Sequence, residues 1–262
     1  MKKIFFISLA VIATLSMFCS CEKSGKGGQG GSGRKAGDSF DIKIDGQFAD
    51  WKDAAIPTAE LDEDMVTDYR NLLVLKSCGD KDNMYFYFEV AIDEEQTWST
   101  FGLYLDVDNN PLTGGVSWLW SKEGAGFEYQ IESEDGFLAS NTAYAVMNDI
   151  KCYKNLGPDG VEVWGEGWLG WDENVASGFA TNAGVVKDGV AYFEMAIPRN
   201  IISASKTGAT VNVGGVTFLQ RTWFENIVDG VDEGWWEWPN GGALPASEGG
   251  LTEAELLSVK LP

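Results

Sequence analysis

Apolar side chains alternate with polar or aromatic ones over residues 84–92 (MYFYFEVAI), and this is the clearest pattern in the chain. Every second residue from Met84 to Ile92 is apolar, so these side chains share one face of an extended chain. A repeat of two is typical of a β-strand that is buried on one face. The preceding stretch 71–78 (NLLVLKSC) and the turn residues GDKDN predict an antiparallel partner strand.

Further stretches downstream also read as strands. The tripeptide KDG at 187–189 lies between two apolar runs and predicts a hairpin turn. A short helix is favoured only at 252–258 (TEAELLS). Many short strands separated by turns predict an all-β fold, an antiparallel β-sandwich of jelly-roll type, in one domain spanning residues 40–262. The stretches are 101–108 (FGLYLDVD), 127–133 (FEYQIES), 160–167 (GVEVWGEG), 184–198 and 210–224.

Residues 1–20 have the order of charge and apolarity of an export signal. Lys2 and Lys3 precede an apolar run of about 15 residues, whereas a membrane-spanning helix needs about 20. The tetrapeptide FCSC that ends at Cys21 resembles a bacterial lipobox. The resemblance implies that Cys21 is diacylated and holds the chain at a membrane. An ordinary cleaved signal or a short anchor helix is the alternative.

Residues 21–39 combine the predicted acylated cysteine with a segment of glycine, serine and charged residues. The eighteen residues after Cys21 contain no large apolar side chain, so they predict a flexible tether with a reach of roughly 20–25 Å. We therefore expect a lipid-anchored protein of the bacterial cell envelope, at the outer membrane. The sequence leaves both the periplasmic and the surface side open.

The charge of the chain narrows the classes of partner. Loss of Lys2 and Lys3 with the signal moves the formal net charge from −21 to −23, because two of 19 basic residues and none of 40 acids leave. Such a surface repels nucleic acid and polyanionic glycans and favours neutral ligands or metal cations. The chain has no histidine, which excludes Ser-His-Asp and Cys-His catalysis and histidine-ligated zinc or haem.

Cys78 and Cys152 are the two cysteines of the predicted domain. An exported protein can form a disulfide, and this one would stabilise the fold by about 4 kcal/mol if the geometry allows. Spacing alone cannot bring the two sulfurs together, so two buried thiols are an equal alternative.

Several segments, taken in order, resemble carbohydrate-binding module family 9-like domains. The opening IDGQFADW (44–51) resembles the signature of that family, and later stretches follow the same strand order: DKDNMYFYFEV (80–90), FGLYLDVDNNPLTGG (101–115), GFEYQIE (126–132) and VAYFEMAIPRNII (190–202). The resemblance implies a β-sandwich that binds sugar ends between aromatic rings. Relatives of this fold also include haem-binding redox domains, so the fold does not settle the ligand.

Tryptophan is abundant, with 11 residues in the chain. Indole rings stack on the apolar faces of sugars, while nearby carboxylates and amides bind the hydroxyl groups. Two clusters surrounded by glycine or proline predict an exposed glycan site, although aromatic rings also fill cores. The candidate ligand-binding residues are Trp118, Trp120, Trp235, Trp236, Trp238, Glu128, Glu237 and Asn240.

The loop DVDNNPLTGG offers oxygen ligands at alternate positions. Asp106, Asp108 and Asn110 have the spacing that starts a calcium loop, and Glu128 could join them from the neighbouring strand. Pro111 stands where an EF-hand needs glycine, and Ser117 stands where it needs glutamate, so this is not an EF-hand. A calcium-stabilised loop of another kind and a plain acidic hairpin turn both remain open.

These features predict a non-catalytic, carbohydrate-binding lipoprotein that recognises neutral glycans by tryptophan stacking. The alternative is a protein-binding or structural surface lipoprotein without sugar affinity. A glycoside hydrolase is the lesser alternative, because paired carboxylates arise by chance in a chain this acidic. No cofactor is expected apart from Ca²⁺ as an option.

Overall fold

The computed structural model describes residues 37–61, 72–91, 98–110, 113–114, 126–137, 150–155, 171–220, 243–244 and 256–262. All of them belong to the compact unit Arg34–Pro262. They form the 3-10 helix η1 (Asp50–Lys52) and the strands β1 (Thr58–Glu60), β2 (Leu72–Gly79), β3 (Asn83–Ala91), β4 (Trp98–Asp106), β5 (Tyr129–Phe137), β6 (Ile150–Asn155), β7 (Trp171–Ser177), β8 (Thr181–Lys187), β9 (Val190–Pro198), β10 (Thr210–Gln220), β11 (Ala243–Leu244) and β12 (Leu257–Lys260).

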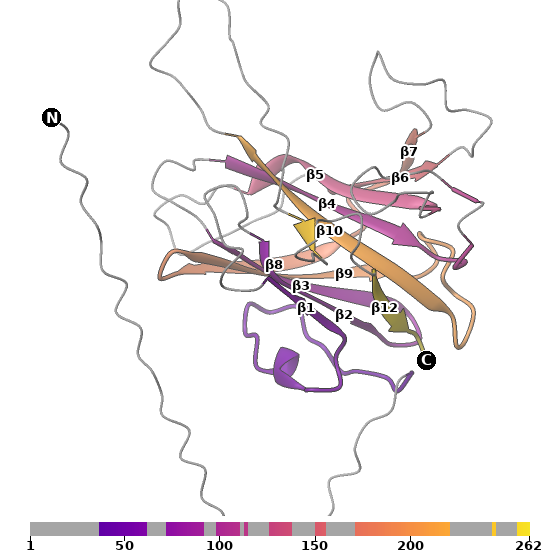
Figure 1. The fold of residues 1–262 in the computed structure, drawn as a ribbon, viewed down its shortest axis with the longest axis horizontal. Coiled ribbons are helices and arrows are strands. Elements are labelled where there is room, and N and C mark those ends of the chain that lie inside the picture. The colour runs from indigo at the N-terminus through magenta and orange to yellow at the C-terminus, as the bar shows by residue number, and fades with distance from the viewer. Residues whose placement is uncertain are drawn as a thin grey trace, which may run out of the picture. The chain divides into compact units, whose positions relative to one another are not determined.

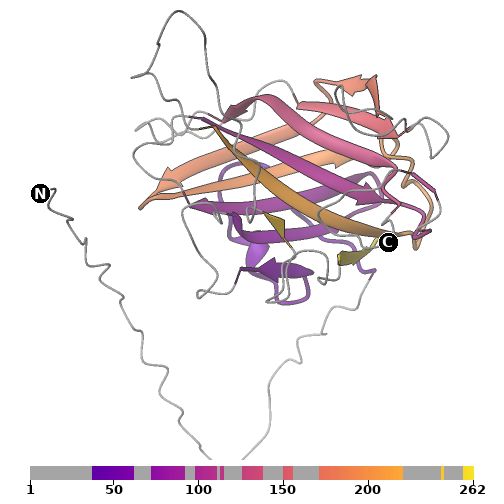
Figure 2. The same cartoon turned by 45° about the horizontal axis from the view of Figure 1, so that its top comes forward.

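The strands build two antiparallel sheets that face each other (Figure 1, Figure 2). The first sheet has the order β1-β2-β3-β9-β8. The second has the order β11-β10-β4-β5-β6-β7, and β12 also pairs with β10. The expected all-β antiparallel sandwich is therefore confirmed.

The core between the sheets follows the alternation read from the sequence. Met84, Phe86 and Phe88 of β3 are fully buried, as are Leu103 and Leu105 of β4. Successive side chains of a strand point to opposite faces, so the apolar half of each alternating stretch enters one shared core. The register Lys187↔Val190 between β8 and β9 places the predicted hairpin turn at 188–189.

The outer face of the five-stranded sheet is covered as well. Tyr85 and Tyr87 point away from the core between the sheets, yet they are only 6% and 5% exposed. Residues 40–56, which include η1, pack on this face and bury Trp51 against the two tyrosines. Figure 1 shows this indigo segment on the side of the sheet opposite to the second sheet.

Glu194 of β9 fastens this covering segment to the sheet. Its carboxylate accepts hydrogen bonds from the backbone amides of Asp45 (2.6 Å) and Gly46 (2.5 Å) and from the indole Nε1 of Trp51 (2.9 Å). Gly46 has φ +76°, a conformation that favours glycine. Burial raises the pKa of the Glu194 carboxyl, and the three donors oppose that shift. The IDG and tryptophan of residues 44–51 thus act as one structural unit.

Arg199, at the end of β9, holds three other segments together. Arg199 is 2% exposed, and its guanidinium donates to backbone oxygens of Asp80, Ala204, Lys206 and Pro262. The charge is satisfied by oriented carbonyl dipoles, and each carbonyl gains a donor.

Two expectations can be compared directly with this fold. The predicted helix at 252–258 is wrong over its last two residues: Leu257 and Ser258 lie in β12, where Leu257 is buried and pairs with Val213 of β10.

Neither Cys78 nor Cys152 is in a disulfide in the structure, and both are buried. They belong to different hydrophobic clusters, Cys78 on the outer face and Cys152 between the sheets, and burial raises the pKa of the Cys152 thiol to about 12.

Among the residues that the structure describes, no helix has the length and apolar character needed to cross a membrane. The predicted signal (1–20) and most of the tether (21–39) lie outside the described residues, as does the predicted strand 160–167.

Candidate cation site

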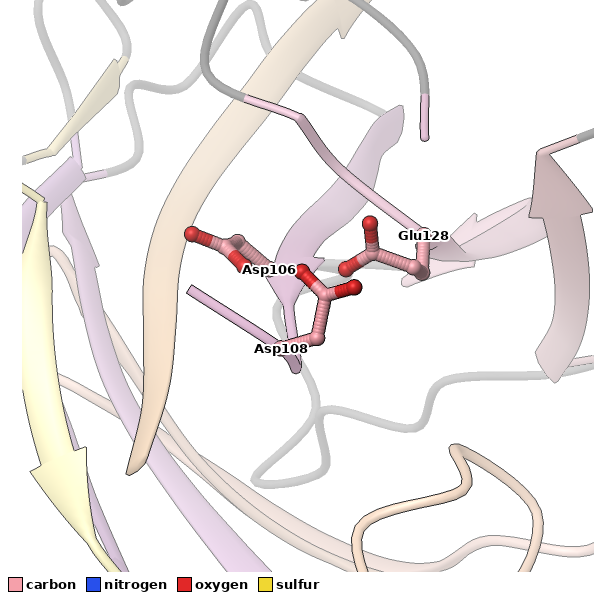
Figure 3. A group of neighbouring side chains, drawn as sticks. All are labelled: Asp106, Asp108 and Glu128. Carbon is pink, nitrogen blue, oxygen red and sulfur yellow. The ribbon is translucent and has the colours of Figure 1, made fainter. Parts of the chain in front are cut away.

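Three carboxylates gather where β4 ends and β5 begins. Asp106 is the last residue of β4, Asp108 lies two residues further along, and Glu128 precedes the first residue of β5. The two strands are antiparallel, with Leu105 opposite Tyr129, so the end of one strand meets the start of the other. One oxygen from each carboxylate lies within 4.8 Å of the other two, and Figure 3 shows the three side chains side by side.

Hydrogen bonds within the loop fix two of these carboxylates. Asp106 is 6% exposed and accepts from the amide of Asn109 (2.6 Å) and from the side-chain amide of Asn212 on β10 (2.9 Å). Asp108 accepts from the amide of Asn110 (2.9 Å) and from the hydroxyl of Thr113 (3.0 Å). Backbone amides of the loop therefore donate to the side chains of its own aspartates, as in other short turns that contain Asp and Asn.

Glu128 is the carboxylate with a vacant acceptor. Its Oε2 accepts from the amide of Val107 (2.9 Å), whereas its Oε1 is buried without a hydrogen-bond donor. The Thr113 hydroxyl has one proton and three neighbouring acceptors, on Asp108, on the carbonyl of Asn110 and on Glu128, so it cannot satisfy all of them. Burial, followed by the charges of Asp108 and Asp106, raises the pKa of Glu128 to about 6. A buried oxygen without a donor costs free energy and is a natural ligand for a cation.

No basic side chain of the described ranges lies within ion-pair distance of these three acids. Three like charges this close repel one another, and a divalent ion would relieve that repulsion. Carboxylate and carbonyl oxygens are the ligands that Ca²⁺ prefers. The donor set of Asp106, Asp108 and Glu128 fits a hard cation, with water or other oxygens completing its coordination.

The structure brings together Asp106 and Asp108 as the spacing predicts. Asn110, the third predicted ligand, closes the turn through its backbone, because its carbonyl accepts from the amide of Thr113 (3.1 Å). Glu128 was predicted to bind sugar hydroxyls or to join the calcium loop from the neighbouring strand, and it lies in the acid cluster. Asn212 was missed, and only its register opposite Asp106 on β10 reveals it.

Two glycines close the base of the loop that follows. Gly114 has φ +67°, and a Cβ there would meet the carbonyl of Phe127 and lie 2.7 Å from Glu128 Oε1. A Cβ on Gly126 would meet the carbonyl of Thr113 and lie 2.5 Å from that of Asn110. The chain therefore leaves the acid cluster at Gly114 and returns to it at Gly126, and residues 115–125 between them include Trp118 and Trp120.

We expect Gly114→Ala to lower the free energy of unfolding by about 2–4 kcal/mol, because it combines a left-handed backbone strain of about 1–2 kcal/mol with a steric clash. Gly208→Ala is the matched control: Gly208 has φ +72°, and a Cβ added there would have no atom within 4 Å, so it carries the strain alone. Urea unfolding of both variants measures the difference. Equal losses would show that the close approach at Gly114 does not matter.

The other predicted glycan-binding residues lie outside the described residues. They are Trp118, Trp120, Trp235, Trp236, Trp238, Glu237 and Asn240.

The chain matches no protein-family model and no curated protein in sequence. Its functional assignment therefore rests on the residues and their geometry.

Proposed function

We propose that this protein is a lipid-anchored, non-catalytic β-sandwich module that binds neutral glycans through tryptophan side chains, with Ca²⁺ at the base of one binding loop. The observation that supports the proposal is the acid cluster of Asp106, Asp108 and Glu128, from which the Trp118/Trp120 segment starts and to which it returns. A cation bound there would fix both ends of that segment.

Pre-organisation gives such a cation a role in recognition. Ordering a loop on binding costs free energy, and a loop whose ends are already fixed loses less freedom when it contacts a ligand. The ion supplies charge neutralisation at Asp106, Asp108 and Glu128. The chain's own residues then do the binding: indole rings cover apolar sugar faces, and neighbouring polar groups take the hydroxyls.

The remaining parts of the proposal come from the sequence. The segment that ends at Cys21 resembles a lipobox, and the glycine-rich tether would hold the domain away from the membrane. The ordered resemblance to carbohydrate-binding module family 9-like domains supports glycan binding, and the formal net charge of −21 favours uncharged ligands at the tryptophan site.

The calcium part is tested by thermal melting of the full chain with Ca²⁺ and with chelator. Saturation to about 100 times Kd is expected to stabilise the domain by about 2.7 kcal/mol. Protons compete for Glu128, whose pKa is about 6, so the gain should be smaller at pH 5 than at pH 7.5. Asp108→Asn should abolish most of the gain. Asp188→Asn, an exposed acid in the β8–β9 turn, should keep it; a melting point indifferent to Ca²⁺ in the wild type would end the calcium proposal.

Glycan binding is tested by tryptophan fluorescence of the full chain against neutral mono- and oligosaccharides. We expect a saturable shift with one sugar class, weakened about 5- to 150-fold in Trp118→Ala or Trp236→Ala, if sugar stacking on an indole matches the roughly 1–3 kcal/mol of a nucleobase stacked on an aromatic side chain. Chelation should weaken the same response. No shift with any sugar would overturn the proposal and favour a protein-binding surface lipoprotein.

A further inference from the structure

A groove of about 390 Å³ lies on the outer face of the five-stranded sheet, away from the core between the sheets. This volume is at the lower end of the range of ligand sites. Its walls come from the sheet and from the covering segment around η1. The side chains that matter for its chemistry are Phe48, Lys52, Lys76, Tyr87, Glu89 and Tyr192.

The strand register explains why these side chains meet. Tyr87 and Glu89 are two residues apart on β3, so both point to the outer face. Lys76 of β2 is opposite Tyr87, and Tyr192 of β9 is opposite Glu89. Four outward side chains from three adjacent strands thus form one continuous patch, which Phe48 borders.

Aromatic rings form the apolar part of the groove. The ring of Phe48 lies 5.8 Å from that of Tyr192 and 5.5 Å from that of Tyr87, and Tyr87 stacks on Trp51 at 5.4 Å. Phe48 and Tyr192 are half-buried, so parts of their rings stay open to solvent. A row of fixed rings offers a preformed surface to the C–H face of a sugar.

Basic side chains outnumber acidic ones in the lining of this groove. Lys52 and Lys76 line it against a single acid, Glu89, in a chain whose net charge is −21. Lys52 and Lys76 have no acid of the described ranges within 4.0 Å, so neither ammonium group is neutralised by an ion pair there. The groove lining thus holds two basic side chains and one acid, and the buried Glu194 lies opposite Tyr87 on the same face of the sheet.

The polar groups are also held in place. Lys76 Nζ donates to the carbonyl of Trp51 (3.2 Å) and lies 5.9 Å from the centre of the Tyr87 ring. The hydroxyl of Tyr87 donates to Glu89 Oε1 (2.6 Å). Lys76 keeps further N–H donors and Glu89 keeps a second oxygen, so the groove presents both donors and an acceptor beside its rings.

We propose that this groove binds a single sugar ring that carries one carboxylate, a residue of the uronic acid class. The rings of Phe48 and Tyr192 cover the apolar face of the sugar. Lys52 and Lys76 receive its carboxylate through charge-assisted hydrogen bonds, and Glu89 accepts from a ring hydroxyl. The site lies on the other sheet from the acid cluster and uses none of the tryptophans assigned to neutral glycans.

Ligand-observed NMR titration of the full chain tests the assignment with three probes. D-glucuronate has the ring and the carboxylate, D-glucose has the ring alone, and acetate has the carboxylate alone. We expect a millimolar Kd for glucuronate and at least fivefold weaker binding of glucose and acetate. Raising the salt concentration from 0.05 to 0.5 M should weaken glucuronate binding, because exposed charges are screened over about 4–14 Å in that range.

Lysine variants test whether glucuronate binds in the groove. Lys52→Met changes an exposed side chain, and the double variant Lys52→Met/Lys76→Met removes both cations; each should weaken glucuronate at least threefold. Lys81→Met is the matched control and should bind as the wild type does. An unchanged affinity in Lys52→Met, or no saturable response to glucuronate, would overturn the assignment. So would glucose that binds as tightly as glucuronate and is weakened equally by Lys52→Met, because binding of glucose at the tryptophan site would not respond to that substitution. Trp118→Ala should leave glucuronate binding intact, which separates failure of this site from failure of the neutral-glycan proposal.

Discussion

Replacing Glu194 by alanine is expected to lower the free energy of unfolding by about 3–5 kcal/mol. The change leaves the amides of Asp45 and Gly46 and the indole N–H of Trp51 without an acceptor. Hydrogen bonds to a charged group contribute about 1.5–3 kcal/mol each, and a donor left buried without a partner loses its hydration as well. The covering segment would lose its attachment to β9.

Glu194→Gln should cost about half as much in urea unfolding. The glutamine oxygen can keep the two backbone donors, but its amide group then faces the N–H of Trp51, and two donors cannot bond. Glu60→Gln, on the exposed edge strand β1, is the control and should change stability by less than about 0.5 kcal/mol. If Glu194→Ala unfolds at the same urea concentration as the wild type, Glu194 does not fasten the segment.

Arg199→Met is expected to cost about 3–5 kcal/mol in the same assay. Methionine fills much of the volume but leaves the backbone oxygens of Asp80, Ala204 and Pro262 without the Arg199 donor, whereas the carbonyl of Lys206 keeps the amide of Ala209 (3.1 Å). Arg199→Lys should recover only part of the loss, because an ammonium cannot span the four acceptors as the planar guanidinium does.

Lys154→Met, which removes an exposed positive charge from β6, provides the comparison for Arg199. It should leave the urea midpoint within about 0.5 kcal/mol of the wild type. An equal effect of the two substitutions would mean that loss of positive charge, and not loss of the carbonyl contacts, destabilises the domain.

The alternation of apolar and polar residues was sufficient to predict most of the strands of the sandwich and their buried faces. The inward residues of β3 and β4 follow from alternation, because a strand with a buried face must repeat every two residues. The burial of Tyr85 and Tyr87 did not follow from it. These rings are covered by residues 40–56, a segment with little periodicity whose docking depends on one distant side chain, Glu194.

The acid cluster and the groove differ in the same way in how far the sequence predicts them. Asp106 and Asp108 are visible in the sequence because their ligand spacing is local. Asn212 contacts Asp106 across 106 positions, and only strand pairing brings them together. The groove was not predicted for the same reason: its residues come from β2, β3, β9 and the covering segment, and none of these stretches has a ligand-binding spacing by itself.

The attachment of residues 45–46 to Glu194 also sets an order of events during synthesis. Asp45 and Glu194 are 149 positions apart, so a ribosome needs about 7–30 s to make the second after the first. During that interval Phe40, Ile42 and Trp51 have no β9 to pack against. The first part of the domain to be made therefore cannot complete its contacts until β9 has been made, and a chain that stops before Glu194 would lack the acceptor that holds this apolar segment on the sheet.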